Sequence, residues 1–208
     1  GDTEIDLNLT SNQIELDDIF SYGGANYVPE DYRHEVLKDV KIHGITAMHF
    51  KGNQLTTDLA IDKIEAFAQS HNVRLERFSG NIYLDTANLK IDNLGGKLGN
   101  TELKADLLYH LDSVDAPGPH IFTLRSPRLD FDQLFSYAPP AETTDSASVD
   151  HEDGFNIFDL PFSNLEFDLV VDHLNYHRYL IDDFALKGRM QENHYIYIDT
   201  MALKAAGG

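Results

Sequence analysis

A twelve-residue segment occurs twice in the chain, and this repetition constrains the fold more than any other feature of the sequence. Residues 11–22 read SNQIELDDIFSY, and residues 126–137 read SPRLDFDQLFSY. The two copies share the first Ser, the central Asp and the final Phe-Ser-Tyr. A second pair of similar segments, IYLDTANLK at 82–90 and IYIDTMALK at 196–204, lies at nearly the same offset. Similarity at a fixed period is typical of repeat architectures.

The repetition predicts two related β-rich units that form one continuous sheet. The first unit spans residues 1–115, and the second spans residues 116–208 and is truncated relative to the first. A low-complexity stretch at 138–156, small, polar and acidic, is predicted to be a flexible surface loop. Since the second unit ends before it has matched residues 98–109, we expect further strands beyond the end of this sequence.

Alternation of polar and apolar residues predicts that strands dominate. Residues 4–9 place Ile5, Leu7 and Leu9 on one side, which is the period of a strand with one buried face. Turn signals recur every 10 to 15 residues, the spacing of a meander. The predicted fold is therefore mainly β, an elongated, curved antiparallel sheet. The predicted strands are 4–9, 11–16, 42–50, 55–67, 73–78, 82–91, 102–109, 121–124, 129–131, 164–172, 180–187 and 194–204.

One or two short helices are predicted to pack on the sheet, and the one that the sequence indicates most clearly runs from Pro29 to Val40. Proline suits the first helical position, and acidic residues favour the positive end of the helix dipole. Tyr32, Val36 and Val40 would share one face. Breaks between strands are predicted at residues 51–53, 79–81 and 94–100, because each contains glycine.

Charge and motif content narrow the function classes. Sixteen basic and thirty-five acidic residues give a formal charge of −19, which disfavours binding to nucleic acid or to an anionic bilayer. Absence of cysteine excludes disulfides and thiolate metal sites. No phosphate-binding loop, dinucleotide fingerprint or nucleophile elbow occurs. His173 and His177 are four apart but lie beside a predicted strand, where extended chain would separate them by roughly 13 Å, too far for a metal pair. We predict no catalytic residue, metal or cofactor.

The second half of the chain resembles the C-terminal region of AsmA-like proteins. The resemblance rests on the run from Phe158 to Gly208, with its Asp-x-Leu-x-Tyr element at Asp172 to Tyr176 and its Ala-Gly-Gly ending. Residues 129–134, LDFDQL, are similar to the recurring Leu-Asp-Leu-Asp-x-Leu element of that family. Residues 29–33, PEDYR, resemble its short helix start.

This resemblance implies a periplasmic envelope protein of a diderm bacterium, held in the inner membrane by a segment absent from this chain. It implies a curved β-sheet with an apolar inner face, related to bridge-like lipid transporters. The implied role is outer-membrane biogenesis and lipid homeostasis, without catalysis. The implied partner is a phospholipid or another lipid with acyl chains.

The strand patterns by themselves also predict a sheet with one apolar face, which must be covered by a helix, a second sheet or a ligand. We expect this face to form a lipid groove. The candidate groove residues are Leu165, Phe167, Leu169, Val171, Ile196, Ile198, Ile82 and Leu84.

Two other functions are open at this stage. A surface or periplasmic module for glycan or protein binding would use aromatic side chains exposed at a loop edge. A hydrolase would use two carboxylates facing each other across a cleft. The leading Gly and the abrupt ending suggest a piece excised from a longer protein, so the outermost strands would present edges to neighbouring proteins.

Overall fold

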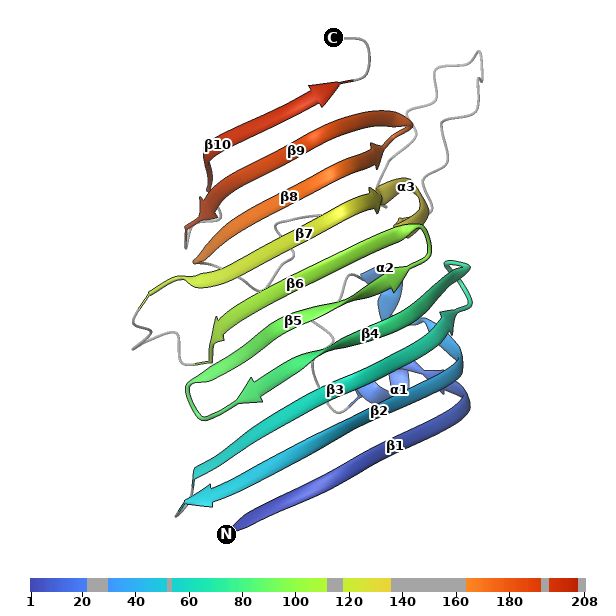
Figure 1. The fold of residues 1–208 in the computed structure, drawn as a ribbon, viewed down its shortest axis with the longest axis vertical. Helices are drawn as coiled ribbons and strands as arrows, with labels where there is room; N and C mark the ends of the chain where they lie inside the picture. The colour runs from blue at the N-terminus through green and yellow to red at the C-terminus, as the bar shows by residue number, and fades with distance from the viewer. Residues whose placement is uncertain (22–29, 52–53, 112–117, 136–163, 192–194, 206–208) are drawn as a thin grey trace.

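A computed structural model describes residues 1–21, 30–51, 54–111, 118–135, 164–191 and 195–205. The chain forms a single ten-stranded sheet in which the strands follow one another in sequence order (Figure 1). Three short helices, α1, α2 and α3, accompany the strands. The strands are β1 Asp2–Glu15, β2 Val36–Lys51, β3 Gln54–Ala68, β4 Val73–Leu84, β5 Asn88–Leu98, β6 Thr101–His110, β7 His120–Asp130, β8 Leu165–Tyr176, β9 Tyr179–Met190 and β10 Ile196–Ala205.

The mainly β, open-sheet prediction is confirmed, but the sheet is mixed rather than purely antiparallel. Strands β7 and β8 run parallel, with His120 opposite Leu165 and Leu124 opposite Leu169. All other neighbours are antiparallel. A parallel pair needs a long crossover connection. The chain supplies it between α3 (Phe131–Leu134) and the start of β8, a span that includes the predicted loop 138–156, which lies outside the described residues.

The predicted helix from Pro29 to Val40 is wrong beyond its first turn. Helix α2 spans only Glu30–Arg33, and Val36 already pairs with Glu15 at the start of β2. Val40, expected on the helix face, pairs with Ser11 and is 1% exposed. A β-branched residue fits a sheet better than a helix when strands are present on both sides. The tertiary pairing therefore overrides the local helix signal.

The predicted break at 79–81 is wrong, and the break at 94–100 is wrong over most of its length, because only Gly99 and Asn100 form a turn there. Strand β4 runs through Gly80, and β5 runs through Gly95 and Gly96. A Cβ on Gly80 would lie 2.7 Å from the Cα of Leu94, and one on Gly96 would lie 2.7 Å from the Phe78 ring. These glycines mark close cross-strand approaches rather than turns. The turn between β4 and β5 instead follows Leu84, inside the predicted strand 82–91.

The two copies of the repeated segment adopt the same local structure. Helix α1 (Leu16–Phe20) follows β1 and helix α3 follows β7, and both helices begin at equivalent positions of the repeat. The second pair differs, because 82–90 spans the end of β4 and the start of β5 while 196–204 lies within β10. The structure therefore shows a repeated strand-to-helix corner, and the division into units 1–115 and 116–208 remains a prediction.

Backbone irregularities recur in the strands and accompany the twist of the sheet (Figure 1). Asp39, Arg77, Asn93 and Asp183 have positive φ angles between 51° and 56°. Register shifts occur next to these residues in the pairings of β2 with β3, β4 with β5, β5 with β6 and β9 with β10. Such bulges increase the local right-handed twist.

A substitution at Gly188 tests the close packing of β8, β9 and β10. A Cβ there would lie 2.6 Å from the backbone oxygen of Tyr197 and 2.7 Å from the Phe167 ring. We expect Gly188→Val to lower the free energy of unfolding by about 1–3 kcal/mol through overpacking. Chemical denaturation measures the change. Gly118→Ala is the control, because nothing lies within 4 Å of a Cβ at that position; equal loss in both variants would contradict the packing argument.

Candidate functional site: the apolar face of the sheet

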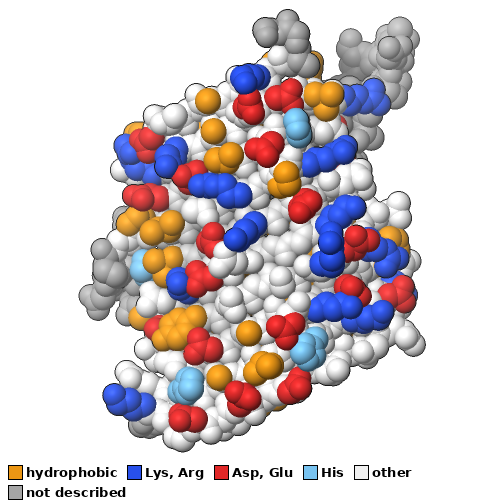
Figure 2. Space-filling view, in the orientation of Figure 1, with side chains coloured by type: hydrophobic (Ala, Val, Ile, Leu, Met, Phe, Trp, Pro, Cys, Tyr) orange, Lys and Arg blue, Asp and Glu red, His pale blue; other side chains and the backbone are white. Residues whose placement is uncertain are grey.

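The register of the strands separates two faces of different chemistry. Directly paired residues point to the same side of a sheet, so a row of paired residues can be followed across all ten strands. One row is charged and mixed: Glu4, Ala47, Asp58, Tyr83, Lys90, Leu108, Ile121, Glu166, Arg189 and Tyr197. Figure 2 shows this side of the molecule, with acidic and basic side chains spread over the sheet.

The neighbouring row, on the opposite face, carries no charge. It contains six aliphatic residues and two phenylalanines, and its other two members are one Thr and one Gly. The row is Ile5, Thr46, Leu59, Ile82, Ile91, Leu107, Phe122, Phe167, Gly188 and Ile198. At about 4.8 Å between strands, such a row extends roughly 43 Å across the sheet. We call this side the apolar face.

All eight groove residues predicted from the sequence lie on the apolar face. Ile82, Phe167 and Ile198 belong to the row just described, and Leu84 lies two residues from Ile82 on the same side. Leu165 and Ile196 both pair with Met190. Leu169 and Val171 follow Phe167 at alternate positions of β8. The structure thus brings them to one surface, and their role in holding lipid remains a prediction.

Exposure varies strongly over this face. Val171 is 1% exposed and Leu165 8%, whereas Leu84 is 40% and Ile198 58% exposed. On β1, Leu7 is 42% exposed. The apolar face is therefore covered in part, and large aliphatic side chains are accessible on β1, at the end of β4 and on β10.

Helices α1 and α2 lie behind the sheet in Figure 1, at one end of strands β2 to β4, which places them on the apolar face. A chain of ring contacts joins this end to the second half of the molecule. The Tyr32 ring stacks on His71 at 3.9 Å between centroids and contacts Phe135 edge-on at 6.3 Å. The Tyr32 hydroxyl donates to the backbone oxygen of Leu134 in α3. Rings of α3 continue the chain to Tyr176.

Glu35 is a buried residue that links the start of β2 to the turn between β3 and β4. Its carboxylate is 1% exposed and accepts hydrogen bonds from the N–H groups of Val36, Ser70 and His71. The His71 Nδ1 lies 2.6 Å from Glu35 Oε2. Burial by itself raises the pKa of Glu35, but the hydrogen bonds from the His71 side chain and from the three N–H groups outweigh burial and leave the pKa below its ordinary value.

Asp130 plays the same part at the end of β7. It accepts hydrogen bonds from the side-chain amides of Asn100 and Asn175 and from the Gln133 N–H, which caps α3. Burial opposes ionisation, but these bonds lower the pKa of Asp130 overall. Asp132, also in the repeated segment, accepts from the N–H groups of the turn between β8 and β9. The acids of the second repeat copy therefore tie three turns together.

Two buried histidines, His110 at the end of β6 and His120 at the start of β7, contact each other. His110 and His120 are each 7% exposed, and the His110 N–H donates to His120 Nδ1 over 3.1 Å. His120 also stacks on Tyr109 at 4.3 Å. Burial lowers the pKa of His120, and the neighbouring His110 lowers it further. These contacts favour a neutral His120 ring, which leaves the apolar face without a fixed charge at this point.

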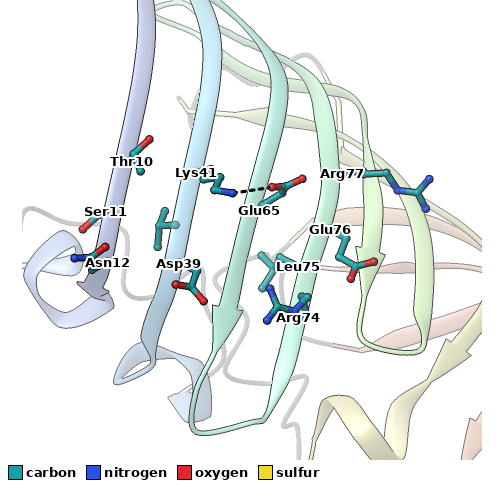
Figure 3. A pocket seen from close by; sticks show the side chains of 11 residues that line it. Thr10, Ser11, Asn12, Asp39, Lys41, Glu65, Arg74, Leu75, Glu76 and Arg77 are labelled. Carbon is teal, nitrogen blue, oxygen red and sulfur yellow. Dashed lines mark ion pairs between the residues drawn. The ribbon is translucent and has the colours of Figure 1, made fainter.

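The charged face contains a shallow hollow over β1, β2, β3 and β4 (Figure 3). Lys41 lies 4.0 Å from Glu65 there, and Arg74, Glu76 and Arg77 line the same hollow. Basic and acidic side chains balance, so the hollow has no distinct preference for an anion or a cation. Among the described residues, no group of three or more His, Asp or Glu side chains is arranged to hold a metal. The His173 Nδ1 instead lies 2.7 Å from Asp182 Oδ1.

Sequence reasoning missed the polar ties at the ends of the apolar face. Glu35 and His71 are 36 residues apart and carry no motif. Asp130 belongs to the repeated segment, and the similarity of the two copies predicts a corner at this position. It does not predict which side chains form hydrogen bonds with the Asp130 carboxylate. The alternation of apolar residues, by contrast, was sufficient to find the face itself.

Replacement of Glu35 by Gln tests the buried tie. Because the folded-state pKa of Glu35 is depressed, its contribution to stability is present above the unfolded value of about 4.5 and is lost as pH falls through the folded value. We expect Glu35→Gln to lower the free energy of unfolding by about 1–3 kcal/mol at neutral pH, since the amide nitrogen that replaces Oε2 cannot accept from the His71 N–H. Below the folded-state pKa the difference from wild type should shrink. Urea denaturation across pH measures both effects, and a difference that does not change with pH would contradict the assignment.

None of the helices in the described part of the chain has the length and apolar character needed to span a bilayer. Comparison of the sequence with protein-family models, with curated proteins and with solved structures finds no match in any of the three.

Proposed function

We propose that the protein is a non-enzymatic module that shelters the acyl chains of lipids on the apolar face of its sheet. The observation that carries the proposal is the uncharged row from Ile5 to Ile198, which crosses all ten strands. Its outer members are 42% and 58% exposed. Contiguous apolar surface of this kind is typical of binding sites rather than of free protein surface.

The physical benefit of such binding is the removal of apolar area from water on both sides. Each buried methylene group contributes about 0.8 kcal/mol, so an acyl chain laid on the face gains affinity with every carbon that contacts it. Aliphatic side chains such as Ile82, Ile91 and Leu107 offer no directed hydrogen bond. The site would therefore select for chain length and shape more than for a head group.

The resemblance to AsmA-like proteins supports the same proposal and extends it. Under this extension, the protein is located in the periplasm of a diderm bacterium and is anchored to the inner membrane through a segment outside this sequence. In that setting the ligand is a phospholipid or another acyl-chain lipid, and the process is outer-membrane biogenesis and lipid homeostasis. These finer statements are part of the proposal.

A second candidate function is recognition of a glycan or a protein at the turn between β8 and β9. Tyr179 is 71% exposed, Leu180 62% and Tyr176 41%, so aromatic and apolar surface gathers at one hairpin. Exposed tyrosines are common in binding surfaces because one end is apolar and the other forms hydrogen bonds. This patch lies at the edge of the sheet and is much smaller than the apolar face.

Organic extraction of the purified protein, followed by mass spectrometry, tests the proposed function. We expect acyl lipids to copurify in stoichiometric amounts. A fluorescent phospholipid should also bind with an affinity that rises with acyl-chain length. Absence of extracted lipid together with absence of binding would overturn the proposal.

Two adjacent residues of β10 give a matched pair of variants. Ile198 is 58% exposed on the apolar face, and Tyr197 is 43% exposed on the charged face. Ile198→Glu places a carboxylate on the lipid-binding surface, and we expect it to weaken binding of the fluorescent phospholipid by about tenfold. Tyr197→Glu adds the same charge on the other side and should leave binding unchanged. Equal effects of both variants would place the ligand elsewhere.

A further inference from the structure

We propose that the free edge of β1 binds an extended polypeptide segment in which basic and apolar residues alternate. This inference is independent of the proposed lipid function, because it concerns the edge of the sheet rather than its apolar face. It rests on the backbone groups that β1 leaves outward, on the regularity of the strand and on its charge.

The hydrogen-bond pattern shows which groups are outward. The Gly1 N–H donates to the Phe50 backbone oxygen over 3.0 Å, and the Phe50 N–H donates to the Gly1 backbone oxygen over 2.9 Å. In an antiparallel ladder such reciprocal pairs alternate along the strand, so the odd-numbered residues of β1 bond to β2. The even-numbered residues point their N–H and C=O groups away from the sheet. These residues are Asp2, Glu4, Asp6, Asn8 and Thr10.

The edge of β1 is regular, whereas the edge at β10 is not. Pairing of β1 with β2 keeps a constant register from Asp2 to Ser11. Pairing of β10 with β9 has two register shifts, between Ile198 and Thr200 and between Ala202 and Lys204. Bulges, Lys and Pro protect edge strands against pairing. β1 contains none of these three, and β10 contains bulges and Lys204. The edge of β1 is therefore the better template for an added strand.

The side chains of β1 specify the chemistry of the added strand. Asp2, Glu4 and Asp6 lie on the charged face, and the strand contains no Lys or Arg. Asp2 and Asp6 have 81% and 73% of their side chains exposed, despite contacts to histidines of β2. Glu4 pairs with Ala47, beyond which the row continues with Asp58. Cations at alternate positions of a partner would complement this row.

The opposite face of β1 requires apolar residues at the intervening positions. Ile5, Leu7 and Leu9 are 40% to 42% exposed, and none of the described strands lies on the outer side of β1. A partner strand with aliphatic residues between its cations would cover these side chains and extend the apolar rows. Alternation of Lys or Arg with Val, Ile or Leu satisfies both faces.

A second copy of the chain satisfies these requirements less well. Pairing β1 with β1 of another copy brings a second set of Asp2, Glu4 and Asp6 to the same seam. Pairing β1 with β10 places Tyr197, Thr200 or Ala202 beside the acids, none of which is a cation. The charge of the edge therefore favours a basic partner segment over self-association.

Binding of short fluorescein-labelled peptides to the intact protein tests the proposal. The probe is an eight-residue peptide of alternating Lys and Val. One control peptide alternates Glu and Val, and another has the same composition as the probe with its four Lys residues before its four Val residues. We expect fluorescence anisotropy to show about tenfold tighter binding of the alternating Lys and Val peptide than of either control. Hydrogen exchange should show new protection of the Asp2, Glu4, Asp6 and Asn8 amides.

Variants separate edge pairing from general attraction to an acidic protein. Glu4→Lys should weaken binding of the Lys and Val peptide about fivefold and strengthen binding of the Glu and Val peptide. Asp6→Pro removes one outward N–H donor and should weaken the peptide complex while leaving the pairing with β2 intact. Glu166→Lys, the same charge reversal on β8, is the control and should change neither affinity.

Several outcomes would overturn the proposal. Equal binding of the block peptide, or equal loss in Glu166→Lys, would show attraction by net charge alone. Protection of β10 amides instead of β1 amides would place the partner at the other edge. Sedimentation showing a dimer that Glu4→Lys strengthens would make a second copy the occupant. Absence of binding by the alternating peptide would exclude the site.

Discussion

The structure depends on one constraint: a single layer of strands has two faces, and side chains alternate between them. Every residue added to one face fixes its neighbour on the other, so the pairing of Thr46 with Leu59 places Ala47 and Asp58 on the charged side. Ten strands in register extend this separation over the whole sheet. An aqueous charged face and an apolar face follow directly from strand alternation once the register is set. In the described part of the chain, the short helices α1 and α2 lie on the apolar face at one end of the sheet.

The register itself is held at the strand ends. Glu35 joins the start of β2 to the turn between β3 and β4, and Asp130 joins the end of β7 to turns on both sides. Both carboxylates are buried and fully satisfied by donors, and removal of a partner from such a group costs more than the formation of the bond contributes. A slip of one residue in β2 or β7 would break these ties and turn the apolar side chains to the charged side. The polar clusters therefore specify the arrangement of strands, while apolar burial provides most of the driving force.

The sequence predicted the class of fold and the apolar face because both depend on alternation, which is local. Phe167, Leu169 and Val171 were placed correctly on one face from spacing alone. Errors arose where local and tertiary signals conflict. Acidic residues at 30 and 31 favoured a helix that continued to Val40, but strands on both sides of β2 convert Val36 to Val40 to extended structure. Gly80 and Gly96 resembled turn residues, but they allow Leu94 and Phe78 to approach the neighbouring backbone. The parallel pairing of β7 and β8 is a tertiary property that cannot be inferred from any short segment of the sequence.

The exposed fractions of the side chains distinguish a buried part of the apolar face from a part that is accessible to solvent. Val40 and Ala66 near the helices are 1% exposed, whereas Ile5 on β1, Leu84 at the far end of β4 and Ile198 on β10 are 40% or more exposed. Burial at the helix end supplies the packing that keeps the sheet in register. Because that packing does not require the remaining aliphatic residues to be covered, these residues are available to a ligand without loss of the fold. A sandwich would bury both regions against a second sheet and leave no such surface. The one-layer architecture thus separates the residues that stabilise the protein from those that we propose bind lipid.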